Sequence, residues 1–262
     1  MAVDVRELSS IEDMAAAAAL IDRIWGEERV VMPALLRALA THGGEVLGAY
    51  RGTELVGAQV AFLGTRDGRL VLHSHITGVA PGQQGAGVGY ALKRGQREWC
   101  LARGIDTVTW TFDPLVARNA HFNLQKLGAV ADRFHRDFYG DMPDAINAGD
   151  RSDRLEVSWE LRSPRVEAAL RGELAEPDAE GVPAAVDERD GLPVSRPLPE
   201  EGPVLVAVPP DYHALRRREP DAAAAWRSAV ADALEAATAR GHAATGFVRG
   251  RGYVLEPAAP AP

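Results

Sequence analysis

The chain has 262 residues, of which 46% are hydrophobic, with a formal net charge of −8 and a single cysteine. The acidic balance argues against a general nucleic-acid binder, and no apolar run of about 18 residues is present that would span a membrane. The lone Cys100 excludes an internal disulfide framework and fits a reducing compartment, so we expect a cytoplasmic protein. The Arg-rich and Ala-rich composition is typical of a GC-rich bacterial genome.

The N-terminal residues predict a strand, two helices and three further strands. Residues 3–8 alternate as a strand, and Ser9 with Glu12 forms a capping box for a helix over 11–25. A second helical segment covers 33–39. Strands are predicted over 46–50, 55–62 and 70–79.

The central residues alternate between helices and strands. Apolar residues at helical spacing predict an amphipathic helix from Val88 to Ala102, which Gly104 ends. A β-rich strand follows over 106–112, broken by Asp113 and Pro114. We then expect a short helix over 118–127, late strands over 130–139 and 154–161, and a polar loop between them.

The C-terminal residues predict an extension after a linker. Pro, Gly and acidic residues dominate 163–202, which we interpret mostly as linker with one short helix over 165–170. A strand over 204–208, a helix over 221–239 and strands over 245–248 and 252–255 follow. This unit is too small to fold alone, so we expect it to dock on the first domain. The chain is therefore expected to have three parts: a domain over 1–162, the linker 163–202, and a small β-α-β extension over 203–262.

A glycine-rich turn joins the strand over 70–79 to the next helix. It reads Gln84-Gly85-Ala86-Gly87-Val88-Gly89. Such a turn presents backbone N–H groups at the positive end of a helix dipole and suits a phosphate or pyrophosphate. It lacks the Gly-Lys-Ser/Thr that ends a P-loop. Its glycines also do not have the last spacing of the Gly-x-Gly-x-x-Gly fingerprint of dinucleotide-binding proteins.

The pattern Gln84-x-x-Gly87-x-Gly89 resembles the acyl-CoA loop of the GNAT superfamily of N-acyltransferases. The segment from Asn119 to Gly128, which ends in Lys-Leu-Gly, resembles the Asn…Lys-Leu-Gly segment of that family, the helix with its closing glycine that follows the fifth strand. The match is closest to a mostly uncharacterised bacterial subgroup. Its further signatures here are Ser74-His75, Trp110 to Leu115, Tyr139-Gly140 and Ser152-Asp153-Arg154.

The resemblance implies an α/β fold: the GNAT fold, a mixed twisted sheet with helices on both faces. It also implies acetyl-CoA or another short acyl-CoA as co-substrate, with the fourth strand beside the pantetheine and supplying N–H groups, and Gly78 as the site of a bulge that frees them. The residues implied to bind the donor are Thr77, Gly78, Val79, Gln84, Gly85, Ala86, Gly87, Val88, Gly89 and Asn119.

Two histidines are candidates for the base that deprotonates an attacking amine. His73 and His75 lie two apart on the predicted strand, hence on one face with Val71, Thr77 and Val79. An imidazole with a pKa of about 6.5 suits this task, and His75 lies nearer the expected thioester. The alternative is a histidine that only packs in the core. A metal pair is the third reading, but no third ligand has the required spacing, so we expect no metal.

The acid that protonates the leaving thiolate is harder to place. Many GNAT enzymes carry a tyrosine four residues before the closing glycine, where this chain has Leu124. Tyr139 is a substitute if it folds back to the site; otherwise it is an aromatic residue packed at a strand end. Asn119 either bonds the pantetheine or caps the helix.

Acceptor recognition has the weakest signal. Asp150, Asp153 and Arg154 cluster before the last strand of the expected domain, and a bidentate arginine suits a substrate carboxylate; an ordinary surface ion pair is the alternative. Lys93 and two arginines follow the glycine-rich turn, either to meet phosphates or as a solvated helix face.

These observations predict an N-acyltransferase that moves an acetyl or short acyl group to a primary amine by direct attack on the thioester. The expected acceptor is a small-molecule amine, such as an amino acid or a natural-product intermediate, with no nucleic-acid or membrane partner. The alternative is a catalytically silent GNAT-fold module that binds acyl-CoA, which Leu124 favours.

Overall fold

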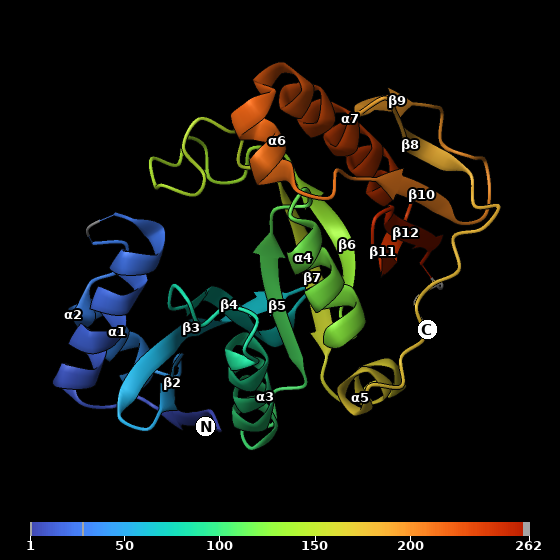
Figure 1. The fold of residues 1–262 in the computed structure, drawn as a ribbon. Coiled ribbons are helices and arrows are strands. Elements are labelled where there is room, and N and C mark those ends of the chain that lie inside the picture. The colour runs from blue at the N-terminus through green and yellow to red at the C-terminus, as the bar shows by residue number, and fades with distance from the viewer. Residues whose placement is uncertain (1, 28, 259–262) are drawn as a thin grey trace. The chain divides into compact units, whose positions relative to one another are not determined.

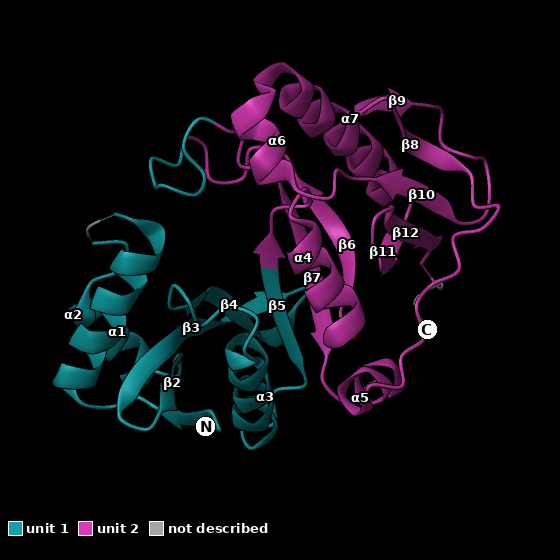
Figure 2. Ribbon diagram, in the orientation of Figure 1, with its two compact units in different colours: residues 1–110, 142–149 teal, residues 111–141, 150–262 magenta. Residues whose placement is uncertain are grey.

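A computed structural model describes residues 2–27 and 29–258, which form two compact units. Unit 1 contains the residues up to Trp110 together with Met142–Gly149, and unit 2 contains Thr111–Asp141 and the residues from Asp150 onward (Figure 2). The division into 1–162, 163–202 and 203–262 that the sequence predicts stays a prediction. Residue 1 of the first part and residues 259–262 of the last part lie outside the described residues.

Unit 1 contains a mixed sheet in the order β1-β2-β3-β4-β5 (Figure 1). Neighbouring strands are antiparallel except β4 and β5, which run parallel. The hairpin β2–β3 turns at Gly52, whose φ of +62° suits glycine. The strands are β1 (Asp4–Glu7), β2 (Glu45–Arg51), β3 (Glu54–Arg66), β4 (Arg69–Val79) and β5 (Thr107–Phe112), the last of which continues into unit 2.

Helices cover both faces of this sheet. Helices α1 (Ile11–Trp25) and α2 (Pro33–Thr41) bury their apolar side chains against one face, with Val46, Val60 and Ile76. Helix α3 (Val88–Leu101) packs Val88 and Leu92 on the other face. The α/β arrangement with helices on both faces of a mixed sheet therefore agrees with the expectation.

The capping box of α1 is one residue later than predicted. Ser10 accepts a hydrogen bond from the amide of Asp13 at 3.0 Å, and the Asp13 carboxylate accepts one from the amide of Ser10 at 3.2 Å. Ser9 and Glu12 were therefore the wrong pair, because aspartate as well as glutamate can complete the box.

In unit 2 the strands follow one another in the order β7-β6-β11-β12-β10-β8-β9. Neighbouring strands are antiparallel except β8 and β10, which are parallel. Ala244 on β11 lies opposite Ala131 on β6, so the C-terminal strands continue the sheet that β6 and β7 begin. The strands are β6 (Val130–His135), β7 (Arg154–Glu160), β8 (Ala184–Arg189), β9 (Leu192–Ser195), β10 (Val204–Ala207), β11 (His242–Val248) and β12 (Gly252–Pro257).

The helices of unit 2 include one irregular segment. The predicted helix over 118–127 is an α-helical turn followed by a π-helix, in which the amide of Leu127 bonds to the carbonyl of Phe122 five residues earlier at 3.0 Å. Helix α7 packs against β6, β9 and β11. The segments are α4 (Ala117–His121), η1 (Phe122–Lys126), α5 (Pro164–Arg171), α6 (Tyr212–Arg218) and α7 (Pro220–Ala239).

The stretch 163–202 contains more regular structure than a linker. It includes the predicted short helix, as α5, and the unpredicted hairpin β8–β9. Ala185 and Val186 are buried, and Val186 lies opposite Val206 of β10. The strands were missed because β8 contains Asp187 and Glu188, and because β9 has only four residues, one of them a proline.

Candidate active site

Strand β4 contains a β-bulge at His75. Its neighbour Ser74 lies opposite Ala61 of β3, and Ile76 lies opposite Val60. Because Ala61 and Val60 are consecutive, β3 has no residue to match His75, which is the additional residue of the bulge. Bulges disrupt the ladder locally and redirect the backbone. The predicted bulge at Gly78 is therefore wrong: Gly78 lies opposite Ala58 in regular register.

The bulge reverses the alternation of side chains along β4. His73 and His75 lie on one face as predicted, with ring centroids 6.1 Å apart. The centroid of the Phe62 ring lies 5.2 Å from that of His73 and 5.8 Å from that of His75. Ile76 packs in the core beneath α1 and α2. After the bulge, Val79 packs with Val88 and Leu92 of α3. Thr77 and Val79 were therefore wrongly placed on the face of the two histidines, because one additional residue shifts a period of two.

His75 has properties that a base needs. The side chain is exposed, yet the surrounding protein atoms desolvate it enough to lower the pKa below the ordinary value for histidine. The imidazole is thus mainly neutral at neutral pH. His73 is less exposed, and its Nδ1 lies 3.2 Å from Oγ1 of Thr109 on β5. The structure therefore distinguishes the two histidines by exposure.

The glycine-rich turn lies in unit 1, where β4 leads into α3. Residues 84–87 are all exposed, and Gly87 is the N-cap of α3 with a φ of +81°. No side chain caps this end of the helix. Arg51 of β2 donates a hydrogen bond to the carbonyl of Ala86 at 3.0 Å, which fixes the turn from outside. The turn thus presents an exposed backbone at the positive end of a fourteen-residue helix.

The residues between the bulge and the turn approach their neighbours closely. A side chain at Gly78 would place its Cβ 2.7 Å from Ile24 and 2.9 Å from Trp25, so α1 needs glycine there. The hydroxyl of Thr77 donates to Gln59 at 3.2 Å. Gly78 is therefore packed against α1 and Val79 against α3, while Thr77 is bonded to β3.

The candidates Tyr139 and Asn119 belong to unit 2. Tyr139 lies in a turn after β6, with its hydroxyl 3.3 Å from Oγ1 of Thr111 and its amide donating to Ser152 at 2.9 Å. Its side chain is 39% exposed. Asn119 is exposed within α4, whose N-cap is Val116, so the capping interpretation is wrong. Leu124, at the position of the usual tyrosine, is completely buried in η1.

The acidic cluster before β7 forms internal ion pairs. Asp153 accepts two hydrogen bonds from Arg151 at 2.7 Å, and its side chain is 1% exposed. Arg154 is also buried, bonds to its neighbour's carbonyl and stacks its guanidinium over the Tyr139 ring. Arg154 is therefore not an exposed clamp for a carboxylate. Asp150 pairs with Arg227, a residue that the sequence analysis did not single out.

Lys93 was also misjudged. It neither points to a phosphate nor lies on a solvated face: it is 3% exposed and bonds to Ser74 and Gln96 at 2.9 Å each. One sequence signal was present, since Lys93, Gln96 and Cys100 share the face of α3 that carries Leu92. Cys100 is fully buried, and burial raises the pKa of its thiol, which fits the packing interpretation over a nucleophile.

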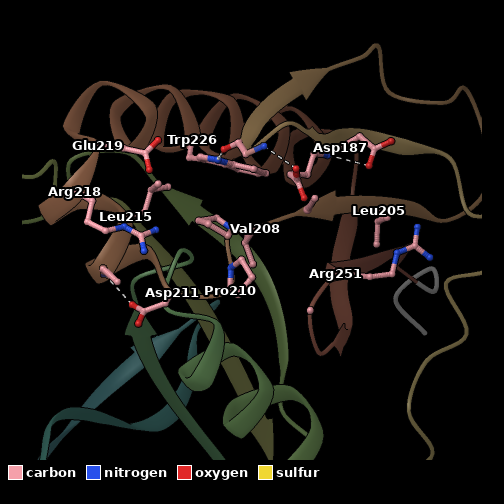
Figure 3. Close-up of a pocket in the computed structure, with 16 residues that line it drawn as sticks. Asp187, Leu205, Val208, Pro210, Asp211, Leu215, Arg218, Glu219, Trp226 and Arg251 are labelled. Carbon is pink, nitrogen blue, oxygen red and sulfur yellow. Dashed lines mark hydrogen bonds between the residues drawn. The ribbon is translucent and has the colours of Figure 1, made fainter.

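Unit 2 also has an open hollow of about 560 Å³ (Figure 3). Leu205, Val208 and Trp226 contribute apolar side chains to its lining, and charged side chains such as Glu219 and Arg251 also line it. None of the predicted site residues lines this hollow. Among the described residues, no His, Cys, Asp and Glu side chains gather in a group that could hold a metal ion, and no helix has the length and apolarity to cross a membrane.

Comparisons with known proteins found similarity only among solved structures. No protein-family model and no curated protein matches the chain. Three similar structures are acetyltransferases. The ribosomal-protein-S18-alanine N-acetyltransferase from Escherichia coli has 15% identity and a TM-score of 0.49, over 61% of this chain and 94% of that one.

The second is the IAA acetyltransferase from Bacillus cereus, with 20% identity and a TM-score of 0.47 over 61% of this chain and 99% of that one. The third, a GNAT-family acetyltransferase from Streptococcus pneumoniae, has 16% identity and a TM-score of 0.49 over 60% and 98% of the two chains. At these values the similarities do not determine an activity.

Proposed function

We propose that the protein is an N-acyltransferase that moves an acetyl or another short acyl group from acyl-CoA to a primary amine. The observation that carries the proposal is the arrangement in unit 1. A bulged strand with an exposed histidine leads directly into an exposed glycine-rich turn at a helix N-terminus. One end of this segment suits thioester chemistry and the other suits a pyrophosphate.

The reaction needs a neutral amine, an oxyanion donor and a way to release the thiolate. His75 accepts the proton as the amine nitrogen attacks the thioester carbonyl carbon. N–H groups of β4 beside the bulge stabilise the negative charge on the carbonyl oxygen. The C–S bond then breaks, the oxyanion returns its electron pair to form the amide, and the CoA thiolate takes up a proton. No covalent bond to the protein forms.

The donor in this proposal contacts several residues of unit 1. The turn from Gln84 to Gly89 holds the pyrophosphate through main-chain N–H groups, and Thr77, Gly78 and Val79 lie along the pantetheine. Asn119 as a pantetheine contact and Tyr139 as the acid remain part of the proposal. The hydroxyl of Tyr139 is within reach of Thr111 at 3.3 Å, which orients it.

The acceptor and the setting also belong to the proposal. We infer a small-molecule amine, such as an amino acid or a natural-product intermediate, as the acceptor. A bacterial cytoplasm is the proposed location, because the chain has one cysteine, which is buried, and a composition rich in Ala and Arg.

A second candidate is an acyl-CoA-binding module without catalysis. The buried Leu124 favours it, because a leucine cannot protonate the thiolate. Isothermal titration with CoA and acetyl-CoA, beside an assay for released thiol over a panel of amines, separates the two. Binding together with amine-dependent thiol release supports the enzyme; binding without release over the whole panel supports the module; and no binding refutes both.

A further inference from the structure

A chain of buried polar side chains lies between the sheet and α3 in unit 1. The carboxylate of Glu45 on β2 accepts hydrogen bonds from Gln59 of β3 at 3.0 Å and Gln96 of α3 at 2.6 Å. The ammonium of Lys93 donates to Gln96 and to Ser74 of β4, each at 2.9 Å. These five side chains are 0–4% exposed. We call them the buried polar chain.

The buried polar chain is costly to fold. Burial raises the pKa of Glu45 to about 7, despite the hydrogen bonds from both glutamines. It likewise lowers the pKa of Lys93 to about 7. The burial of the Lys93 ammonium is compensated by hydrogen bonds to two oxygens and by the Trp110 ring, whose centroid is 3.9 Å from Nζ. In contrast, Oε1 of Glu45 is buried without a hydrogen bond. Apolar residues of similar size would often stabilise such a position as well or better.

Both ends of the buried polar chain reach β4, on either side of the bulge. One end is Ser74, the residue directly before His75. The other end is Gln59, which accepts a hydrogen bond from Thr77, two residues after His75. Side-chain hydrogen bonds therefore connect both flanks of the bulge to β2, β3 and α3. Packing alone holds neither flank in one orientation as tightly as a directional bond does.

We propose that the buried polar chain positions the β4 bulge for acyl transfer, with Ser74, Lys93 and Glu45 as positioning residues that do not touch substrate. This inference rests on the proposed function for its catalytic consequence. The bond from Lys93 holds the side chain of Ser74, and the bond to Gln59 holds the side chain of Thr77. The intervening residues His75 and Ile76 therefore keep one geometry. A transition state that depends on N–H direction is sensitive to small displacements there.

The test compares two substitutions of one side chain. Ser74→Ala removes the acceptor for Lys93, whereas Ser74→Thr keeps the hydroxyl. Cys100→Ala is the packing control. Cys100 is fully buried on α3, the helix that carries Lys93, but it donates no hydrogen bond to β4. The first readout is the backbone amide shifts of His75 and Ile76 in isotope-labelled protein, measured by NMR. The second is the split between kcat and the KM for acetyl-CoA.

We expect Ser74→Ala to move the amide signals of His75 and Ile76 and to lower kcat at least about tenfold, with KM changed less than about twofold. Ser74→Thr should restore both signals and most of kcat, and Cys100→Ala should lower only the melting temperature. Lys93→Met combined with Ser74→Ala should lower kcat little further than Ser74→Ala alone, because both substitutions break the bond between Lys93 and Ser74.

Unmoved amide signals in a folded Ser74→Ala protein would overturn the inference. So would equal losses of kcat in the alanine and threonine variants. The NMR readout needs no turnover: a wild-type protein that acylates no amine refutes the proposed function, while the amide signals still decide whether the buried polar chain holds the bulge.

Discussion

Arg227 of α7 donates two parallel hydrogen bonds to the carboxylate of Asp113, which follows β5, each at 2.8 Å. The two residues are 114 positions apart in the sequence. The same guanidinium bonds to both carboxylate oxygens of Asp150, the residue where the chain re-enters unit 2. The Arg227 side chain is 4% exposed. One residue of the expected C-terminal extension thus satisfies two carboxylates of the preceding region within unit 2.

Arg227→Met should therefore destabilise the protein by about 3–5 kcal/mol, because two largely buried carboxylates lose their partner. Urea unfolding at pH 7 measures this. Arg216→Met is the control: Arg216 also contacts Asp150, at 3.3 Å, but is far more exposed, so its loss should be below about 1 kcal/mol. Equal losses in the two variants would contradict a special role of Arg227.

Acid should weaken this cluster in the wild type. Burial acts to raise the pKa of Asp150, but the hydrogen bond and charge of Arg227 outweigh it and hold the pKa below the usual range. A depressed pKa gives stability that is present above the unfolded value of about 3.9 and is lost as the pH falls below it. The unfolding free energy of Arg227→Met should consequently depend less on pH below about 4.

Much of the fold was predictable, because its elements follow local patterns. The helix over Ile11–Trp25 was predicted with the observed bounds, and β4 and α3 differ from their predicted bounds by one residue. Spacing of apolar residues and glycine at helix ends carry such information in the sequence itself.

The candidate site was less predictable, because its geometry depends on pairing between distant residues. A bulge is an offset between two strands, and nothing within β4 alone distinguishes His75 from Gly78 as the additional residue. Lys93 of α3 is buried against partners on other elements, Ser74 of β4 and, through Gln96, Glu45 of β2. The role of Arg227 depends on Asp113. Charged residues on a helix read as solvated unless the buried partner is known.

Removal of the residues after Gly202 should lose solubility or lower the melting temperature by several degrees. Val204, Leu205, Val206 and Trp226 are at most 1% exposed, so the truncation exposes the apolar surface that they cover. It also removes Tyr253, whose hydroxyl donates to the carbonyl of Pro114 at 2.6 Å. A soluble truncated protein with an unchanged melting temperature would show that the C-terminal residues are independent of the rest.

Glu45→Gln should change how stability depends on pH. The pKa of Glu45 is raised from 4.5 to about 7. The contribution of Glu45 to the free energy of unfolding is therefore fully present below pH 4.5 and is lost as the pH rises through 7. The variant lacks this loss. Its unfolding free energy relative to wild type should therefore rise between pH 4.5 and 8, by on the order of 3 kcal/mol. Urea titrations at five pH values measure the difference, and a difference independent of pH would contradict a raised pKa.

Gly87→Val should weaken CoA binding at least about tenfold, or roughly 1.4 kcal/mol. The φ of Gly87 is +81°, which a β-branched residue rarely adopts. The side chain of the valine would also lie in the proposed pyrophosphate site. Gly104→Val is the matched control, since Gly104 also has a positive φ and open space around it but lies at the other end of α3. Isothermal titration that finds equal CoA affinity for folded Gly87→Val and wild type would refute the donor turn.

His75→Ala should lower kcat about 10²-fold or more and leave the affinity for CoA nearly unchanged. The imidazole is exposed, and desolvation lowers its pKa below about 6.5. The low-pH limb of kcat/KM should therefore lie below this value in the wild type, because only the neutral imidazole accepts a proton. In His75→Ala the limb should disappear or move.

His73→Ala provides the control for His75, because the two rings share one face 6.1 Å apart. His73 is less exposed and lies beside Thr109, so its substitution should reduce thermal stability while kcat changes only a few-fold. The opposite pattern, a lower melting temperature and near-wild-type turnover in His75→Ala, would assign His75 to packing. The amine would then lose its proton to a water chain or to a group on the substrate, and the bulge would serve the carbonyl oxygen alone.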